Sequence, residues 1–92
     1  MAKNSKWTRI VFRTFKSGVQ KGEVIALFID EVSENYVMAY MSSEGHGDAL
    51  YSHIIDITRR ATPEEVAPLA DELHRIGYTN IEVMYRKSNK NQ

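Results

Sequence analysis

Residues 44–48, Glu-Gly-His-Gly-Asp, hold the side chains of this chain that are best suited to chemistry. Two carboxylates and an imidazole alternate with glycines, and a second histidine, His53, follows. Such groups are ligands for a divalent cation and parts of an acid–base pair. The spacing matches no zinc or calcium motif, however, and glycine beside aspartate is typical of a turn. We therefore expect no metal and no other cofactor, and we assign no catalytic residue.

The same residues have two other interpretations. The backbone amides of residues 45–47, exposed in a loop, would bind a small anion, with positive charge supplied by Arg59 and Arg60. On this interpretation the ligand-binding residues are Gly45, His46, Gly47, Asp48, His53, Arg59 and Arg60. Alternatively, His46 and Asp48 would serve a small hydrolase, although no nucleophile motif accompanies them. A polar turn and two solvated arginines would explain the same pattern without any site.

Charge is balanced overall but unevenly distributed along the chain. The sequence has 12 Lys and Arg against 12 Asp and Glu. Residues 1–22 carry six basic side chains and no acid, whereas residues 23–72 carry eleven acids against Arg59 and Arg60. Basic ends would suit a nucleic acid, but the isoelectric point of 6.8 is far below that of typical nucleic-acid-binding domains. We expect the basic ends to lie beside the acidic middle and neutralise it, and we do not expect nucleic-acid binding.

Length and composition restrict the organisation of the chain. Ninety-two residues suit a single domain, for which we expect an ordered core over residues 7–87 and a disordered tail over residues 88–92. The absence of cysteine excludes disulfides and thiolate metal sites. No apolar run is long enough for a membrane span or a secretory signal, so we expect a cytoplasmic protein without a membrane partner.

Residues 62–77 predict a helix with both ends marked. Thr62 and Glu65 have the spacing of a capping box, Pro63 suits the first helical position, and Gly77 suits a left-handed stop. Apolar residues recur at helical spacing between these ends, at Val66, Leu69, Ala70, Leu73 and Ile76. Because Pro68 removes one interior hydrogen bond, we expect a kink or a partly detached first turn.

Apolar and β-branched runs predict strands over residues 7–15, 24–29, 36–41, 52–58 and 81–86, with a loop over residues 42–48. The fold class is therefore α+β: a small, mostly antiparallel sheet of four to five strands with one helix packed on it, in the order β-β-β-(β)-α-β. The second and third runs are apolar on both faces, and one helix covers only one face. Residues 42–60 or a second copy of the chain must cover the other. Aromatic contacts for such a copy would come from Trp7, Tyr36, Tyr40 or Tyr85.

Five stretches carry a resemblance to known proteins. They are Ile-Val-Phe-Arg at residues 10–13, Gly-Glu-Val-Ile-Ala-Leu-Phe at 22–28, Gly-His-Gly at 45–47, Ala-Thr-Pro-Glu-Glu at 61–65 and Gly-Tyr at 77–78. Together they resemble a group of short, uncharacterised proteins of bacteria, phages and other mobile elements. Ser42 stands where that group carries a histidine. The resemblance implies a phage or mobile-element context and brings no activity with it.

These observations favour a non-enzymatic binding module that acts by stoichiometric protein interaction, either with a partner protein or with a second copy as a homodimer. Two alternatives remain open at this point. One is a protein that binds or sequesters a small anionic ligand through the loop over residues 44–60. The other is a small hydrolase that uses His46 and Asp48.

Overall fold

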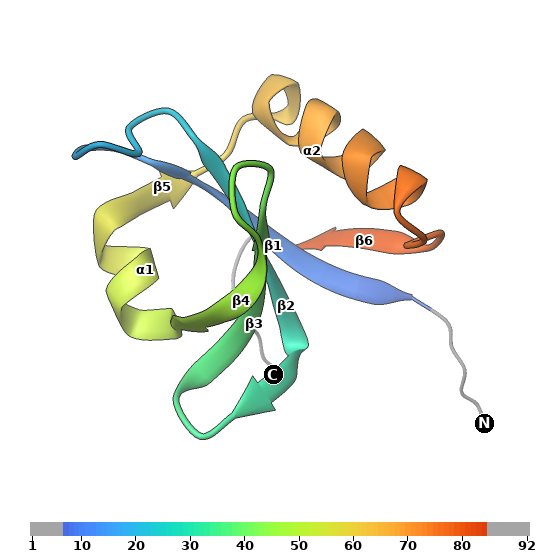
Figure 1. The fold of residues 1–92 in the computed structure, drawn as a ribbon, viewed down its shortest axis with the longest axis horizontal. Coiled ribbons are helices and arrows are strands. Elements are labelled where there is room, and N and C mark those ends of the chain that lie inside the picture. The colour runs from blue at the N-terminus through green and yellow to red at the C-terminus, as the bar shows by residue number, and fades with distance from the viewer. Residues whose placement is uncertain (1–6, 85–92) are drawn as a thin grey trace.

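The computed structural model describes residues 7–84, which form eight elements (Figure 1). They are β1 (Thr8–Phe15), β2 (Val24–Ser33), β3 (Tyr36–Met41), β4 (Gly45–Leu50), α1 (Tyr51–Ile57), β5 (Thr58–Arg60), α2 (Pro63–Arg75) and β6 (Ile81–Met84). The predicted tail over residues 88–92, the last residues of the predicted core and Tyr85 lie outside the described residues.

The strands form one sheet in the order β4-β3-β2-β1-β5, and β6 also pairs with β1. All pairs are antiparallel except β1 and β6, which run parallel. Both β5 and β6 occupy the outer side of β1, where β6 pairs with residues 8–11 and β5 with residues 13–15. The small, mostly antiparallel α+β fold that the sequence predicts is confirmed, and β4 forms the opposite edge of the sheet.

The central strands are buried on both faces. Side chains of a strand alternate between the two faces of a sheet, so that the adjacent residues Leu27 and Phe28, which are 0% and 1% exposed, belong to different apolar clusters. The first cluster lies against α1 through Ile54, and we call this side of the sheet the α1 face. The second lies against α2 through Leu69 and Leu73, and we call this side the α2 face. The predicted second cover is thus found within residues 42–60.

That cover is a helix, which corrects the prediction of a strand over residues 52–58 and of a single helix in the fold. Tyr51, Ile54 and Ile57 are spaced three residues apart and all pack on the α1 face. Isoleucine favours strands, but burial of this stripe against an otherwise open sheet outweighs the intrinsic preference. Only residues 58–60 of the region pair as a strand, β5.

The predicted loop over residues 42–48 is also wrong in most of its length. Only residues 42–44 form a turn, which is closed by a hydrogen bond of 3.1 Å from the Glu44 amide to the Met41 carbonyl. Gly45 follows with a φ of +79° and pairs with Met41, so the hairpin loop has three residues. The chain then pairs with β3 from Gly45 to Leu50. The glycine-rich segment is therefore an edge strand.

Both ends of α2 follow the sequence prediction. The Thr62 hydroxyl accepts from the Glu65 amide at 3.2 Å, and the Glu65 carboxylate accepts from the Thr62 amide at 2.9 Å. At the other end, the Tyr78 amide donates to the Leu73 carbonyl at 3.0 Å across Gly77, whose φ is +122°. This is a Schellman motif. The predicted detachment of the first turn does not occur: the capping box closes that turn, and Pro68 removes only a hydrogen bond to the carbonyl of Glu64, an exposed residue within it.

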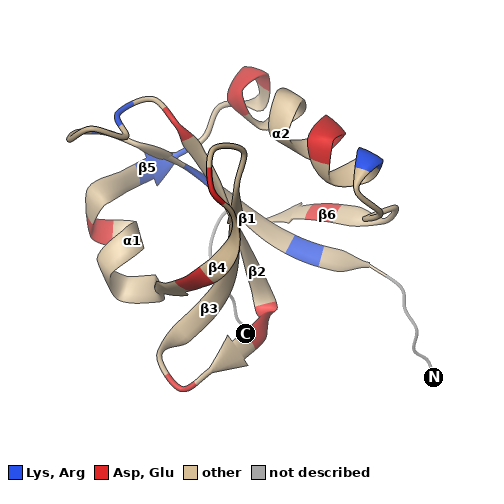
Figure 2. Cartoon of the chain, in the orientation of Figure 1, with Lys and Arg blue, Asp and Glu red and all other residues tan. Residues whose placement is uncertain are grey.

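One basic residue of the N-terminal end pairs with an acid of the middle of the chain: Arg9 on β1 and Asp30 on β2 form an ion pair of 2.6 Å. The second ion pair, of 2.7 Å, joins Arg59 on β5 and Glu65 on α2, which both belong to the middle of the chain. Figure 2 shows basic residues on β1, on β5, on the neighbouring turn and at the end of α2. Within residues 7–84, neither helix is long and apolar enough to cross a membrane.

Candidate functional site

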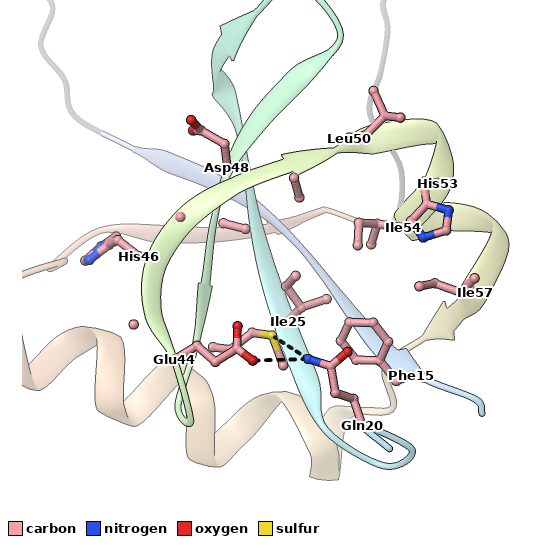
Figure 3. Close-up of a pocket in the computed structure, with 15 residues that line it drawn as sticks. Phe15, Gln20, Ile25, Glu44, His46, Asp48, Leu50, His53, Ile54 and Ile57 are labelled. Atoms are coloured by element: carbon pink, nitrogen blue, oxygen red, sulfur yellow. Dashed lines mark hydrogen bonds between the residues drawn. The ribbon is translucent and has the colours of Figure 1, made fainter. Parts of the chain in front are cut away.

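The side chains of β4 divide between the two faces of the sheet. His46 pairs with Tyr40, whose side chain belongs to the α2 face, so His46 and Asp48 project to that face. Gly45, Gly47 and Ala49 alternate with them and lie on the α1 face. Figure 3 shows the side chains of His46 and Asp48 pointing away from the residues of α1 and from the core beneath it.

A cavity of about 380 Å³ lies on the α1 face, between β4, α1 and the central strands (Figure 3). Its apolar part is formed by Phe15, Ile25, Ala39, Met41, Ile54 and Ile57. Polar groups come from Gln20, Glu44 and His53, and the Gln20 amide donates to the Glu44 carboxylate at 3.4 Å. The volume lies within the range of pockets that hold small molecules or side chains, about 300–1,000 Å³. The cavity exists because β4 presents two glycines to this side.

Substitution by alanine should have opposite effects on the free energy of unfolding at the two glycines of β4. At Gly47, which lacks a positive φ, an added Cβ would meet nothing within 4 Å, so Gly47→Ala should raise the free energy of unfolding by about 0.4–1 kcal/mol. Gly45 has equally open surroundings but a φ of +79°, so Gly45→Ala should lower it by about 1–2 kcal/mol. Urea denaturation measures both values, and effects of the same sign in the two variants would contradict the assigned backbone of β4.

Arg13 on β1 holds the helix that forms one wall of the cavity. Helix α1 has only seven residues, no side-chain cap at its start and no basic residue in its last turn. The Arg13 guanidinium donates to the carbonyls of Thr58 at 2.8 Å and Ile55 at 3.3 Å, and to the Thr58 hydroxyl at 3.0 Å. These bonds satisfy carbonyls that the end of a helix leaves unpaired. Burial lowers the pKa of Arg13 below its ordinary value.

Replacing Arg13 with methionine should therefore loosen α1. Arg13→Met keeps the apolar stem and removes three hydrogen bonds from a charged donor, with an expected loss of about 1–3 kcal/mol in the free energy of unfolding. Hydrogen exchange followed by NMR should show faster exchange in α1 than in α2. Equal changes in the two helices would contradict a specific role of Arg13 in placing α1. Arg9→Met, on the same strand, is the matched control, because Arg9 forms only an exposed ion pair.

His46 takes part in an aromatic cluster on the α2 face. Its Nε2 lies 3.0 Å from the Tyr78 hydroxyl, and its ring meets the Tyr40 ring edge-on with centroids 4.9 Å apart. Burial raises the pKa of the Tyr78 phenol above 10.0, which keeps it protonated. The side chain of Asp48 is not a hydrogen-bonding partner of His46, so the two residues do not form an acid–base pair. His46 thus connects the edge strand β4, through Tyr78, to the segment that follows α2.

His46→Ala should consequently lower stability. The lost hydrogen bond and ring contacts predict a decrease of about 0.5–1.5 kcal/mol in the free energy of unfolding. Thermal and urea denaturation of the variant, beside Tyr78→Phe as the control that removes only the hydroxyl, measure the two contributions. A fully stable His46→Ala variant would instead favour a role for this histidine in binding or catalysis.

The structure brings together only part of the predicted ligand-binding set. Residues 45–48 and His53 surround the cavity. Arg59 and Arg60 lie on β5 and do not line it; Arg59 donates to the Glu65 carboxylate at 2.7 and 2.9 Å. The sequence prediction missed Arg13, because its partners are 42 and 45 residues away. It also missed Ile54 and Ile57, although their spacing of three residues from Tyr51 is a helical signal.

A second, larger groove lies between α2 and the ends of β2 and β3, with a volume of about 550 Å³. Its three carboxylates are hydrogen-bonded within the protein. Glu72 accepts from the hydroxyls of Ser42 and Tyr40, which lower its pKa below 4.5, and Glu23 accepts from Ser43 at 2.9 Å. Glu65 accepts from Arg59 and Thr14. Across residues 7–84, no three potential metal ligands converge.

Comparison with known proteins gives no match to this chain: no family model, no curated protein and no solved structure matches it. The argument for a function therefore depends on the geometry around β4 and α1.

Proposed function

We propose that this protein is a non-enzymatic binding module that acts by stoichiometric interaction with another protein. One observation carries the proposal: the cavity of about 380 Å³, which contains apolar side chains such as Phe15 and Ile25, has as one wall β4, the strand at the edge of the sheet formed by residues 7–84. Apolar surface that the fold leaves unfilled beside exposed backbone suits the side chains and main chain of a partner. A phage or mobile-element context and a cytoplasmic location belong to the same proposal and derive from the sequence.

The geometry gives less support to the two alternatives. A small anion in the cavity would face the Glu44 carboxylate, while Arg59 is occupied by Glu65 and lies elsewhere. Hydrolysis by His46 would need a base or nucleophile within hydrogen-bonding distance, and the partner of its Nε2 is the Tyr78 phenol. The first alternative uses arginines that lie away from the cavity, and the second uses two side chains that are not hydrogen-bonded to each other.

Native mass spectrometry of tagged protein purified gently from its host tests the proposal. We expect a complex that contains this chain and one other polypeptide in a fixed ratio. A retained small molecule without a second polypeptide would contradict the proposal and favour ligand binding. A free monomer at all concentrations would contradict it as well, and a dimer of the chain alone would identify a second copy as the partner.

A further inference from the structure

We infer that the free edge of β4 binds an extended segment of the partner by strand addition, and that this segment alternates aliphatic residues with lysine or arginine. The inference rests on the proposed function and deepens it, because it names the surface and the chemistry of the partner. Three observations carry it: the backbone of β4, the cavity beside it and the charge around it.

Among residues 7–84, no strand pairs with the outer side of β4, so its outward-facing backbone groups have no partner strand in this part of the chain. In an antiparallel pair, the backbone groups of alternate residues point toward the partner strand and away from it. The Tyr51 amide, directly after β4, donates to the Asn35 carbonyl at 3.2 Å, so residues 45, 47 and 49 face β3 and residues 46, 48 and 50 face outward. The strand has six residues and contains neither lysine nor proline, which commonly protect an edge from pairing.

The cavity can receive side chains from an added strand. Such a strand would lie about 4.8 Å beyond β4, with alternate side chains on the α1 face. Gly45 and Gly47 carry no side chain on that face, and an added Cβ at either position would meet nothing within 4 Å. A long aliphatic side chain can thus extend over β4 into the apolar space formed by Phe15, Ile25 and Ile54. Main-chain bonds would supply affinity, and the cavity would select side chains.

The charge around β4 determines which partner is favoured. Between Lys21 and Arg59 the sequence has no lysine or arginine, and its acids there are Glu23, Asp30, Glu31, Glu34, Glu44, Asp48 and Asp56. Figure 2 shows this absence of basic residues on β3, β4 and α1. A second copy that paired through β4 with Asp48 opposite Asp48 would bring two acids together, and like charges on adjacent strands are destabilising. Lysine or arginine opposite Asp48 is favourable, so the occupant is a cationic segment of a different protein.

The test is a selection from a displayed library of random peptides of six residues, the length of β4. We expect enriched sequences in which Val, Ile or Leu alternates with Lys or Arg. NMR titration of a selected peptide should shift the amides of β4 and α1, and affinity should fall as salt rises. Enrichment of helical apolar spacing, of acidic peptides or of no pattern would overturn the inference, as would peptide binding outside β4.

Two variants test separately whether the cavity receives a side chain of the peptide and whether Asp48 selects its charge. Gly47→Leu fills the cavity without touching the edge-facing backbone groups, and should weaken the selected peptide at least about tenfold. Asp48→Lys should reverse the preference, so that a peptide with Glu in place of Lys binds more tightly than the original. Asp71→Lys, the same charge change at an exposed position of α2, is the control and should retain both preferences. Unchanged binding by both β4 variants would contradict strand addition.

The same variants separate this inference from the proposed function. If the polypeptide complex found by native mass spectrometry persists in Gly47→Leu and Asp48→Lys, the protein is a binding module that uses another surface, and only the strand addition is wrong. If the variants instead abolish a dimer of the chain itself, the edge binds a second copy and the cationic partner is wrong. Absence of any complex in the wild-type protein contradicts the proposed function.

Discussion

Alanine in place of Leu27, or separately of Phe28, should lower the free energy of unfolding by about 2–5 kcal/mol in each case. These adjacent residues of β2 are 0% and 1% exposed, and they pack in clusters on opposite faces of the sheet. Each truncation removes apolar contacts and leaves a cavity that the surrounding strand and helix fill only partly. Because domains of this size have about 5–15 kcal/mol of stability, either change removes a large part of it.

Urea denaturation of the two variants measures the effects, and Val32→Ala is the matched control on the same strand. Val32 is 43% exposed, so its truncation should change stability by less than about 0.5 kcal/mol. A sheet covered on one side only would tolerate one of the two changes. A loss below about 1 kcal/mol at Leu27 would therefore contradict the packing of α1 on the sheet.

The parts of the fold that the sequence predicts well are those with local signals. Helix α2 begins and ends as expected because its capping box and its Schellman motif each involve residues within five positions of one another. Strands β1, β2 and β3 follow from β-branched and aromatic runs, and the two-sided burial of β2 and β3 follows from their lack of alternation. From that burial the sequence also predicts that a second cover must exist.

The identity of that cover was not predictable from local signals alone. Helix α1 is too short to be stable by itself, and it is held by Arg13, whose partners are more than 40 residues away along the chain. Its three isoleucines are intrinsically strand-forming, and only the open face of the sheet makes the helix favourable. Burial against the sheet therefore determines that this segment is a helix, although its intrinsic propensity favours a strand.

The candidate site, too, was predictable from the sequence only in part. The sequence predicts the glycine-rich segment as a loop whose side chains converge, whereas in the structure it is a strand whose side chains alternate. That alternation sends His46 and Asp48 to the α2 face and leaves Gly47 beside the cavity. Of the aromatics expected for contacts, Trp7 and Tyr36 are 61% and 50% exposed. Tyr40 is only 8% exposed, because it packs in the apolar cluster on the α2 face, and its hydroxyl donates to Glu72.

Glu65→Gln should lower the free energy of unfolding by about 1–3 kcal/mol near neutral pH, because Glu65 joins three parts of the fold. Its carboxylate accepts two hydrogen bonds from Arg59, one from the Thr62 amide and one from the Thr14 hydroxyl, which is fully buried on β1. A glutamine offers one acceptor oxygen and no charge, so Arg59 loses its ion pair. Glu64→Gln, on the exposed side of the same turn, should cost little and is the control.

The effect of Glu65→Gln should depend on pH in one direction. Hydrogen bonds from Arg59, and then from Thr62, lower the pKa of Glu65 from 4.5 to about 2. A carboxylate with a lowered pKa in the folded state contributes stability above its unfolded pKa, and that contribution disappears as the pH falls through the folded pKa. The difference in unfolding free energy between wild type and Glu65→Gln should therefore be largest above pH 4.5 and shrink toward pH 2. A difference that stays constant across this range in urea denaturation would show that the carboxylate charge is not what joins β1, β5 and α2.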